Sequence, residues 1–190
     1  MPSTAVKKTE EDIVRGIQPG DQRAFKELFY LYYKQLCHFA HLFIHSKEMC
    51  EEAVLDVFFH VWVRREQLDP KRNIRSFLYV AVRNQAIKYC QRENPVHSQN
   101  NIDICELEME SPEPSVDEVI DRKLFRERLQ KAYCELPERC RIIAQMHFSE
   151  QLQYREIAEI LEISNESVRV QIGIAIQKIK KIFQKYGWDK

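Results

Sequence analysis

The sequence predicts an all-α protein that contains two small helical domains joined by a flexible acidic linker. Apolar residues recur at the helical period of 3.6 through most of the chain, only 4 glycines are present, and strand-like alternation is scarce. Between Pro95 and Pro114 this periodicity gives way to proline, serine, asparagine and acidic residues. We therefore expect domains over residues 1–92 and 115–190, with the linker over residues 93–114.

Four helices are expected in the first domain. Thr9-Glu10-Glu11-Asp12 is typical of a helix start, and Gly16 to Gly20 ends that short helix. A long helix follows from a cap at Asp21 to about Ile44. Ser46 caps the third helix, which Leu68-Asp69-Pro70 interrupts. The fourth helix extends from about Ile74 to Arg92, with an inward face formed by Phe77, Leu78, Ala81 and Val82.

The second domain is expected to end in a helix-turn-helix. A capping box at Ser115-Val116-Asp117-Glu118 opens a helix to about Glu135, and Pro137 opens another that ends near Phe148. Two short apolar-periodic segments then meet at Glu162-Ile163-Ser164, where Ile163 can fill the gap and Ser164 can cap the second segment. The residues expected to be buried are Ile157, Ala158 and Leu161 on the first helix, and Val168, Ile172 and Ala175 on the second.

The charges are divided along the chain although the formal net charge is zero. Residues 1–92 contain 15 Lys and Arg against 11 Asp and Glu, and residues 122–190 contain 14 against 9. Residues 93–121 contain 9 acidic residues and no Lys or Arg. Two basic blocks thus flank an acidic strip, which predicts two nucleic-acid-binding faces.

Several classes of function find no support in the sequence. The 6 cysteines form no C-x-x-C pair, so we expect reduced thiols and no metal site, with His38, His41 and His45 as ordinary packing or surface residues. No phosphate loop, nucleophile elbow or H-E-x-x-H motif is present, so we expect neither an enzyme nor a cofactor. Without a signal peptide or an apolar run of about 20 residues, the protein is expected to be cytoplasmic, with no membrane insertion.

The segment from Ile74 to Arg92 combines cations with aromatic rings. Between Arg64 and Arg92 the chain has 8 basic and 2 acidic residues. Cations neutralise DNA phosphates, and aromatic rings stack on unpaired bases. Basic amphipathic helices are also common as solvated surfaces, so this segment alone leaves both interpretations open.

The preceding helix has one aromatic residue outside its apolar stripe. The stripe itself is best explained as core and consists of Val57, Phe58, Val61 and Trp62. An exposed Phe59 beside Asp56 and His60 would indicate a protein-binding surface. The alternative is that a neighbouring helix covers Phe59.

These segments together resemble a known family. Region 2 of the sigma-70 family is similar to AFKELFYLYYKQL, EEAVLDVFFHVW and IRSFLYVAVRNQAIKYCQR, in that order. Region 4 is similar to LPERCRIIAQMHFSEQLQYREIAEILEISNESV. Because no other domain lies between them, the layout resembles that of an extracytoplasmic-function (ECF) RNA polymerase sigma factor. The resemblance covers about residues 21–92 and 122–183.

The resemblance implies that the chain binds bacterial core RNA polymerase and directs promoter recognition and DNA melting. It assigns binding of the β′ coiled coil to Leu55, Asp56 and Phe59. The loop from Leu68 to Asn73 would capture a base flipped from the minus-ten element. Contacts with that element are assigned to Arg72, Asn73, Arg75, Tyr79, Arg83, Asn84 and Lys88. The second domain would dock on the β flap and read the minus-thirty-five element, and an anti-sigma protein is the implied inhibitor.

The helix-turn-helix departs from the family pattern in two places. Glu162 stands where glycine is common, so we expect a turn geometry other than left-handed. In VRVQIGIAIQKIK, the family usually has cations where Gln171, Ile174 and Ile176 stand. Either Ile174 and Ile176 pack on a partner such as an anti-sigma domain, or contact with the minus-thirty-five element relies on other polar residues: Asn165, Ser167, Arg169, Gln171 and Lys178, with Lys180 and Lys181.

Other interpretations remain open at this point. The acidic linker is either a solvated tether or a segment that threads a basic channel of the polymerase. The whole chain could instead be a stand-alone helix-turn-helix transcription regulator, or an adaptor that binds only proteins. The segments Leu55–Trp62 and Ile74–Arg92 discriminate between these classes, because a stand-alone regulator does not need them.

Overall fold

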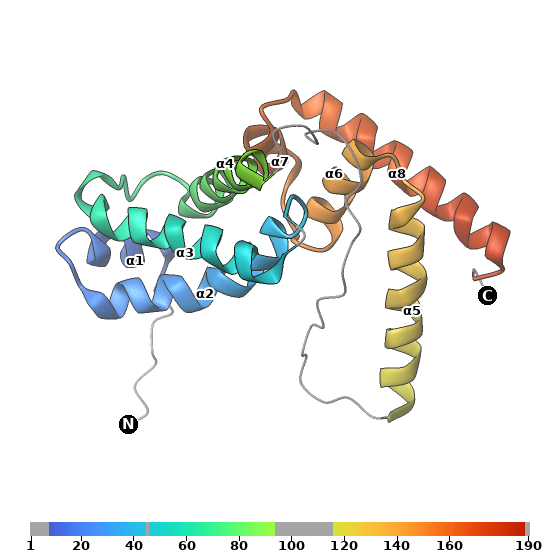
Figure 1. Cartoon of the computed structure of the whole chain (residues 1–190), viewed down its shortest axis with the longest axis horizontal. Coiled ribbons are helices and arrows are strands. Elements are labelled where there is room, and N and C mark those ends of the chain that lie inside the picture. The colour runs from blue at the N-terminus through green and yellow to red at the C-terminus, as the bar shows by residue number, and fades with distance from the viewer. Residues whose placement is uncertain (1–7, 45, 94–115, 189–190) are drawn as a thin grey trace. The chain divides into compact units, whose positions relative to one another are not determined.

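The computed structural model describes residues 8–44, 46–93 and 116–188, and within these ranges the chain is helical, with no strand (Figure 1). The chain divides into two compact units, Met1–Asp103 and Ile104–Lys190, and this division falls within the expected linker. The linker itself, residues 93–114, lies almost wholly outside the described residues. The elements in order are α1 (Glu10–Ile17), α2 (Gln22–Ala40), α3 (Lys47–Val63), the 3-10 helix η1 (Arg65–Gln67), α4 (Ile74–Glu93), α5 (Val116–Cys134), α6 (Glu138–Phe148), α7 (Tyr154–Leu161) and α8 (Asn165–Tyr186).

The start of α1 follows the expected capping pattern. The Asp12 amide donates to Thr9 Oγ1, and the Thr9 amide donates to the Asp12 carboxylate at 3.0 Å. The Asp12 carboxylate also accepts a hydrogen bond from the Thr9 hydroxyl at 2.7 Å, and this bond together with the one from the Thr9 amide lowers the pKa of Asp12 below its usual value. The helix ends before Gly20, whose φ of +94° is a left-handed conformation that suits glycine.

Helices α2, α3 and α4 pack pairwise against one another, and α1 lies along α2. Aromatic rings fill the space between α2 and α3, with centroid distances of 5.0 Å from Phe25 to Trp62 and 4.9 Å from Phe29 to Phe58. The long helix predicted to reach Ile44 ends at Ala40. A turn closes it, because the amides of Phe43 and Ile44 both donate to the Ala40 carbonyl.

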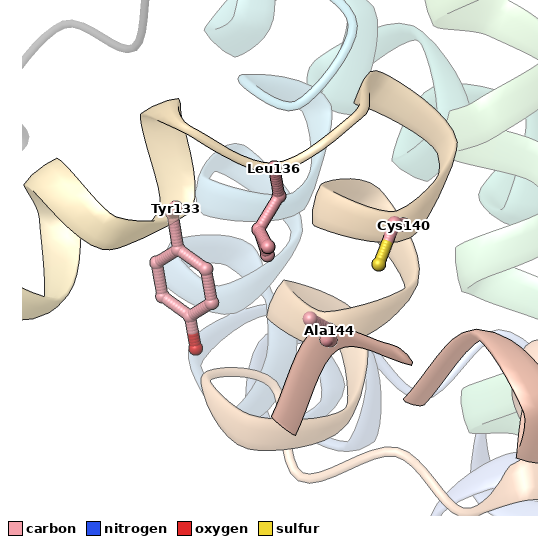
Figure 2. Close-up of a cluster of buried hydrophobic side chains, with 5 residues drawn as sticks. Tyr133, Leu136, Cys140 and Ala144 are labelled. Atoms are coloured by element: carbon pink, nitrogen blue, oxygen red, sulfur yellow. The ribbon is translucent and has the colours of Figure 1, made fainter. Parts of the chain in front are cut away.

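The second unit has its own core, formed where α5, α6 and α8 meet. Figure 2 shows Tyr133 and Leu136 facing Cys140 and Ala144, and Ala175 of α8 belongs to the same cluster. The Cys140 thiol donates to a backbone carbonyl of α8, that of Gln171, at 3.4 Å. This core holds α8 against α6 independently of the first unit.

The helix-turn-helix forms as expected, but its turn geometry does not. Glu162 has φ 55° and ψ 44°, so the left-handed conformation predicted to be avoided is present. The turn is stabilised by amide hydrogen bonds from Glu162 to the Glu159 carbonyl and from Ile163 to the Ala158 carbonyl, which satisfy the end of α7. The hydrogen bonds of the turn therefore outweigh a strain of about 1 kcal/mol at a residue with a side chain.

The buried face of α7 differs from the prediction, since Ala158 is only half-buried. Ile157 and Ile160 are buried, whereas Leu161 is half-buried. On α8 the predicted residues Val168, Ile172 and Ala175 are all buried. Ser164 caps α8 as predicted by accepting a hydrogen bond from the Ser167 amide at 3.0 Å.

Candidate protein-binding and DNA-binding surfaces

An apolar stripe is exposed along α3. Leu55 is 49% exposed and Phe59 is 64% exposed, so the Phe59 ring is not covered by a neighbouring helix. Val63, which the sequence analysis missed, is 56% exposed and lies one turn further along. These three residues are spaced by four, so they share one face of the helix. We call Leu55, Phe59 and Val63 the α3 stripe; an exposed apolar row of this kind is typical of a protein-binding surface.

Asp56 has a different position from its neighbours on α3. It is half-buried, and its carboxylate accepts hydrogen bonds from Gln85 Nε2 and from the Tyr89 hydroxyl, each at 2.9 Å. Both donors belong to α4. Burial, reinforced by the bond to Asp56, raises the pKa of Tyr89 to about 12. Asp56 therefore links the α3 stripe to α4.

The loop between η1 and α4 is held in place at both ends. At its start, Gln18 Nε2 donates to the Leu68 carbonyl at 2.8 Å. Within it, the Asp69 carboxylate accepts from the Lys71 amide at 3.0 Å, while the Arg72 side chain is 84% exposed. At its end, Asn73 Oδ1 accepts from the Ser76 amide at 3.0 Å and so caps α4. The Arg72 guanidinium forms an exposed ion pair with the Asp69 carboxylate, with Nε 3.8 Å from Oδ2.

The structure reverses two predictions for α4. Tyr79, predicted to contact DNA, is 0% exposed and packs on Phe39 with ring centroids 4.8 Å apart. Phe77, predicted to face inward, is 47% exposed. Two residues apart on a helix point about 160° away from each other, so only one of the two rings can enter the core. Leu78, Val82 and Tyr89 are buried on the side of α4 that carries Tyr79, so Tyr79 is the ring that enters the core.

The other predicted residues of α4 divide into two groups. Asn84 and Lys88 are exposed, and they lie on the same outward side of the helix as Phe77. Arg75 and Arg83 are half-buried, and the Arg75 guanidinium lies over the Tyr79 ring at 5.8 Å from its centroid. The outward face of α4, which we define as Phe77, Asn84 and Lys88, therefore presents a cation, an amide and an aromatic ring together. Such a set can bind a nucleic-acid strand by phosphate contact and stacking.

Helix α8 carries the predicted polar residues on different sides of its axis. Asn165, Arg169 and Lys178 are exposed, whereas Ser167 and Gln171 are half-buried. The Ser167 hydroxyl is engaged with Ser164 Oγ at 2.8 Å as part of the helix cap. Arg169 lies 3.2 Å from the Glu166 carboxylate, an exposed pair that contributes little to stability.

Apolar side chains are exposed on α8 between these polar residues. Val170 and Ile176 are each 50% exposed, and Ile174 is 37% exposed. A Cβ built on Gly173 would meet nothing within 4 Å. The side of α8 that points away from the core thus carries apolar as well as polar side chains.

The described residues contain neither a cluster of three metal-ligating side chains nor a helix long and apolar enough to cross a membrane. Two thiols of the first unit, those of Cys37 and Cys50, have pKa values that burial raises to about 11 and about 12. These thiols are therefore protonated near neutral pH.

An exposed apolar stripe, a basic aromatic helix and a separate helix-turn-helix on one chain define a transcription protein that contacts both a protein and DNA. Comparison of the sequence with family models identifies that protein class. Sigma-70 region 2 matches residues 28–95, and Sigma-70, region 4 matches residues 126–179. The chain belongs to the sigma-70 family, and it is a sigma factor of the ECF type.

Two curated proteins are similar over most of the chain. The ECF RNA polymerase sigma factor RpoE of Cereibacter sphaeroides is 22% identical over 162 residues, which is 85% of this chain and 87% of that protein. The ECF RNA polymerase sigma factor SigW of Bacillus subtilis is 19% identical over 175 residues, which is 88% of this chain and 93% of that protein.

Two solved structures share the fold. CnrH in complex with the cytosolic domain of CnrY has a TM-score of 0.64 at 18% identity, and the match covers 94% of this chain and 99% of CnrH. The match to the structure of sigma factor RpoE with the anti-sigma factor NepR from Bartonella quintana has a TM-score of 0.61 at 16% identity. It covers 85% of this chain and 98% of the matched chain.

Proposed function

We propose that this protein binds core RNA polymerase and directs it to a set of promoters, where it assists in opening the DNA. The observation that carries this proposal is the presence of sigma regions 2 and 4, in that order, on one chain. The protein supplies promoter specificity, and the polymerase performs the chemistry. Its site of action is the cytoplasm, where polymerase and promoter DNA meet.

The first unit contacts both polymerase and the minus-ten element in this proposal. The α3 stripe is the docking face for the β′ coiled coil, because it is apolar and exposed on a helix whose opposite face, with Val57 and Val61, is buried. The outward face of α4, with Arg72 and Asn73 of the preceding loop, contacts the melted strand. Flipping a base costs a few kcal/mol of stacking, so the loop must be held in place before the base arrives. The hydrogen bonds from Gln18 and to Asn73 supply that order.

The second unit docks on the β flap and reads the minus-thirty-five element with α8. In a helix-turn-helix the second helix enters the major groove, and residues near its N-terminus contact the base edges. Asn165 and Arg169 are exposed in those first turns, and Lys178 follows further along. Ser167 and Gln171 contribute less to these contacts, because their side chains are half-buried.

An anti-sigma protein is the expected inhibitor. The two solved structures named above are both complexes with another protein: CnrH with the cytosolic domain of CnrY, and the sigma factor RpoE with the anti-sigma factor NepR. For this chain we expect a partner that covers polymerase-binding surface, including the α3 stripe, and so prevents assembly with core enzyme.

Run-off transcription with core enzyme tests the proposed function. Core polymerase is given a promoter library with and without this protein, and the RNA products are sequenced. We expect transcripts that depend on the protein and share two upstream elements. A stand-alone regulator would bind DNA without core enzyme and would start no transcripts of its own, and that outcome would contradict the proposal.

A further inference from the structure

The outward face of α8 combines an apolar strip with cations on both of its sides. Val170, Gly173 and Ile174 form the strip, which lies on the side of the helix opposite the buried residues Val168 and Ala175. We call these three residues the α8 strip. By helical geometry, one flank of the strip carries Arg169 and Lys180, and the other carries Lys178, while Lys181 lies on the side of the strip itself, two turns beyond Ile174. All four cations are exposed.

Charge complementarity favours DNA as the occupant of this face. Cations on both sides of a helix match the two phosphate backbones that border a groove. An apolar protein partner would gain nothing from them. Gly173 adds no side chain to the strip, and the space in front of it is open, so the helix backbone can approach the base edges closely.

The chemistry of the strip selects which bases it reads. Val170 and Ile174 have neither donors nor acceptors, so they cannot recognise guanine in the way that arginine or lysine does. In the major groove the one apolar group on a base edge is the C5-methyl of thymine. We infer that the α8 strip reads thymine methyl groups in the minus-thirty-five element, so that this protein prefers A·T pairs where related helices use cations.

This inference rests on the proposed function and adds to it the base class that α8 recognises. It is tested on the holoenzyme, made from core polymerase and this protein, with a minus-thirty-five element selected from a duplex library. Each thymine of that element is then replaced by uracil, which lacks only the C5-methyl group. The measured quantity is the affinity of the holoenzyme for each duplex.

We expect at least one thymine at which the loss of the methyl weakens binding about fourfold, the effect of removing one buried methylene-sized contact. Ile174→Ala or Val170→Ala should abolish the difference between thymine and uracil. Ile176→Ala is the matched control: it is another exposed isoleucine of α8, but it lies about 160° around the axis from Ile174. That variant should keep the full difference.

The possible outcomes distinguish failure of this inference from failure of the proposed function. A holoenzyme that transcribes but binds thymine and uracil duplexes equally at every position overturns the strip as a base reader. Unchanged promoter binding by Ile174→Arg in that case would assign the strip to a protein partner instead. If no promoter in the library is transcribed at all, the proposed function itself is wrong, and the inference is lost with it.

Discussion

The Asp56 carboxylate shows how a single residue can serve the fold next to a surface that serves binding. It was predicted from the sequence as a polymerase contact, yet it accepts hydrogen bonds from both Gln85 and Tyr89 of α4. Its neighbours Leu55 and Phe59 are exposed and have no such partners on α4. The effect of mutating Asp56 will therefore combine altered folding with altered binding.

Tyr89→Phe tests this hydrogen bond in isolation. We expect the variant to lose about 2 kcal/mol of unfolding free energy near neutral pH, because a hydrogen bond to the half-buried Asp56 carboxylate is removed. In the folded protein the pKa of Tyr89 is raised from its ordinary value of 10 to about 12. The stabilisation from the Tyr89 hydroxyl is thus complete below pH 10 and is lost as the pH rises through 12.

Urea unfolding at several pH values measures both effects. The gap in stability between the wild type and Tyr89→Phe should close between pH 10 and pH 12. Tyr30→Phe, at a 70% exposed position on α2, serves as the control and should change neither stability nor its pH dependence. A gap that stays constant across that range would contradict the role given to the hydroxyl.

Phe77 and Tyr79 have opposite roles and give a second test at this scale. Tyr79→Ala should lose about 3 kcal/mol or more of unfolding free energy, because it leaves a cavity beside Phe39. Phe77→Ala should leave stability within about 1 kcal/mol of the wild type, because the Phe77 ring is already half in solvent. In transcription assays Phe77→Ala should slow opening of a duplex promoter more than initiation from a promoter with an unpaired minus-ten segment.

At the scale of helices, the α3 stripe is the element whose function depends on being uncovered. Val63 continues the row begun by Leu55 and Phe59 and extends the predicted polymerase contact by one turn. Truncating a central aromatic residue of an interface commonly costs 2 kcal/mol or more. We therefore expect that substitutions at Phe59 and at Val63 each weaken binding to core polymerase.

Phe59→Ala should weaken binding to core polymerase about thirtyfold, and Val63→Glu should weaken it about tenfold, by placing a charge in an apolar contact. Leu31→Ala is the control, since Leu31 is an exposed leucine on α2 outside the stripe. Titration of fluorescently labelled protein with core enzyme measures all three. If Val63→Glu binds core polymerase as tightly as the wild type does, the polymerase contact is limited to Leu55 and Phe59.

The sequence was sufficient for the order of the helices and for most of their caps. Thr9, Ser46 and Ser164 cap helices as predicted, because short-range hydrogen bonds determine a helix start. It failed where a choice depended on packing between helices. Local pattern could not decide whether Phe77 or Tyr79 enters the core, and it could not foresee that the turn hydrogen bonds would hold Glu162 in a left-handed conformation.

For the candidate surfaces, too, local sequence pattern was informative, whereas contacts between helices could not be predicted. Phe59 was singled out because it falls outside the apolar period of its helix, whereas Leu55 was assigned by the family resemblance. Val63 was missed although the predicted third helix includes it and it follows Leu55 and Phe59 at the same four-residue spacing. Asp56 was misjudged in part because its partners lie 29 and 33 residues away, on another helix.

The whole molecule has a formal net charge of zero, yet each of its two units presents exposed cations. DNA affinity of the holoenzyme should fall steeply with salt, because each phosphate contact releases a counterion. Lys88→Gln should reduce the slope of log affinity against log salt by about 1. Lys34→Gln, an exposed position on α2, should leave the slope unchanged. A filter-binding series between low and moderate salt measures both slopes.

The bond between Asp56 and α4 also constrains how this protein can change over generations. A substitution at position 56 disturbs two helices at once, so its defect can be repaired at Gln85 or Tyr89 without any change in the polymerase. A substitution at Phe59 offers no such repair within the chain. A genetic screen for suppressors should therefore recover intragenic revertants from the first mutant, and changes in the β′ subunit from the second.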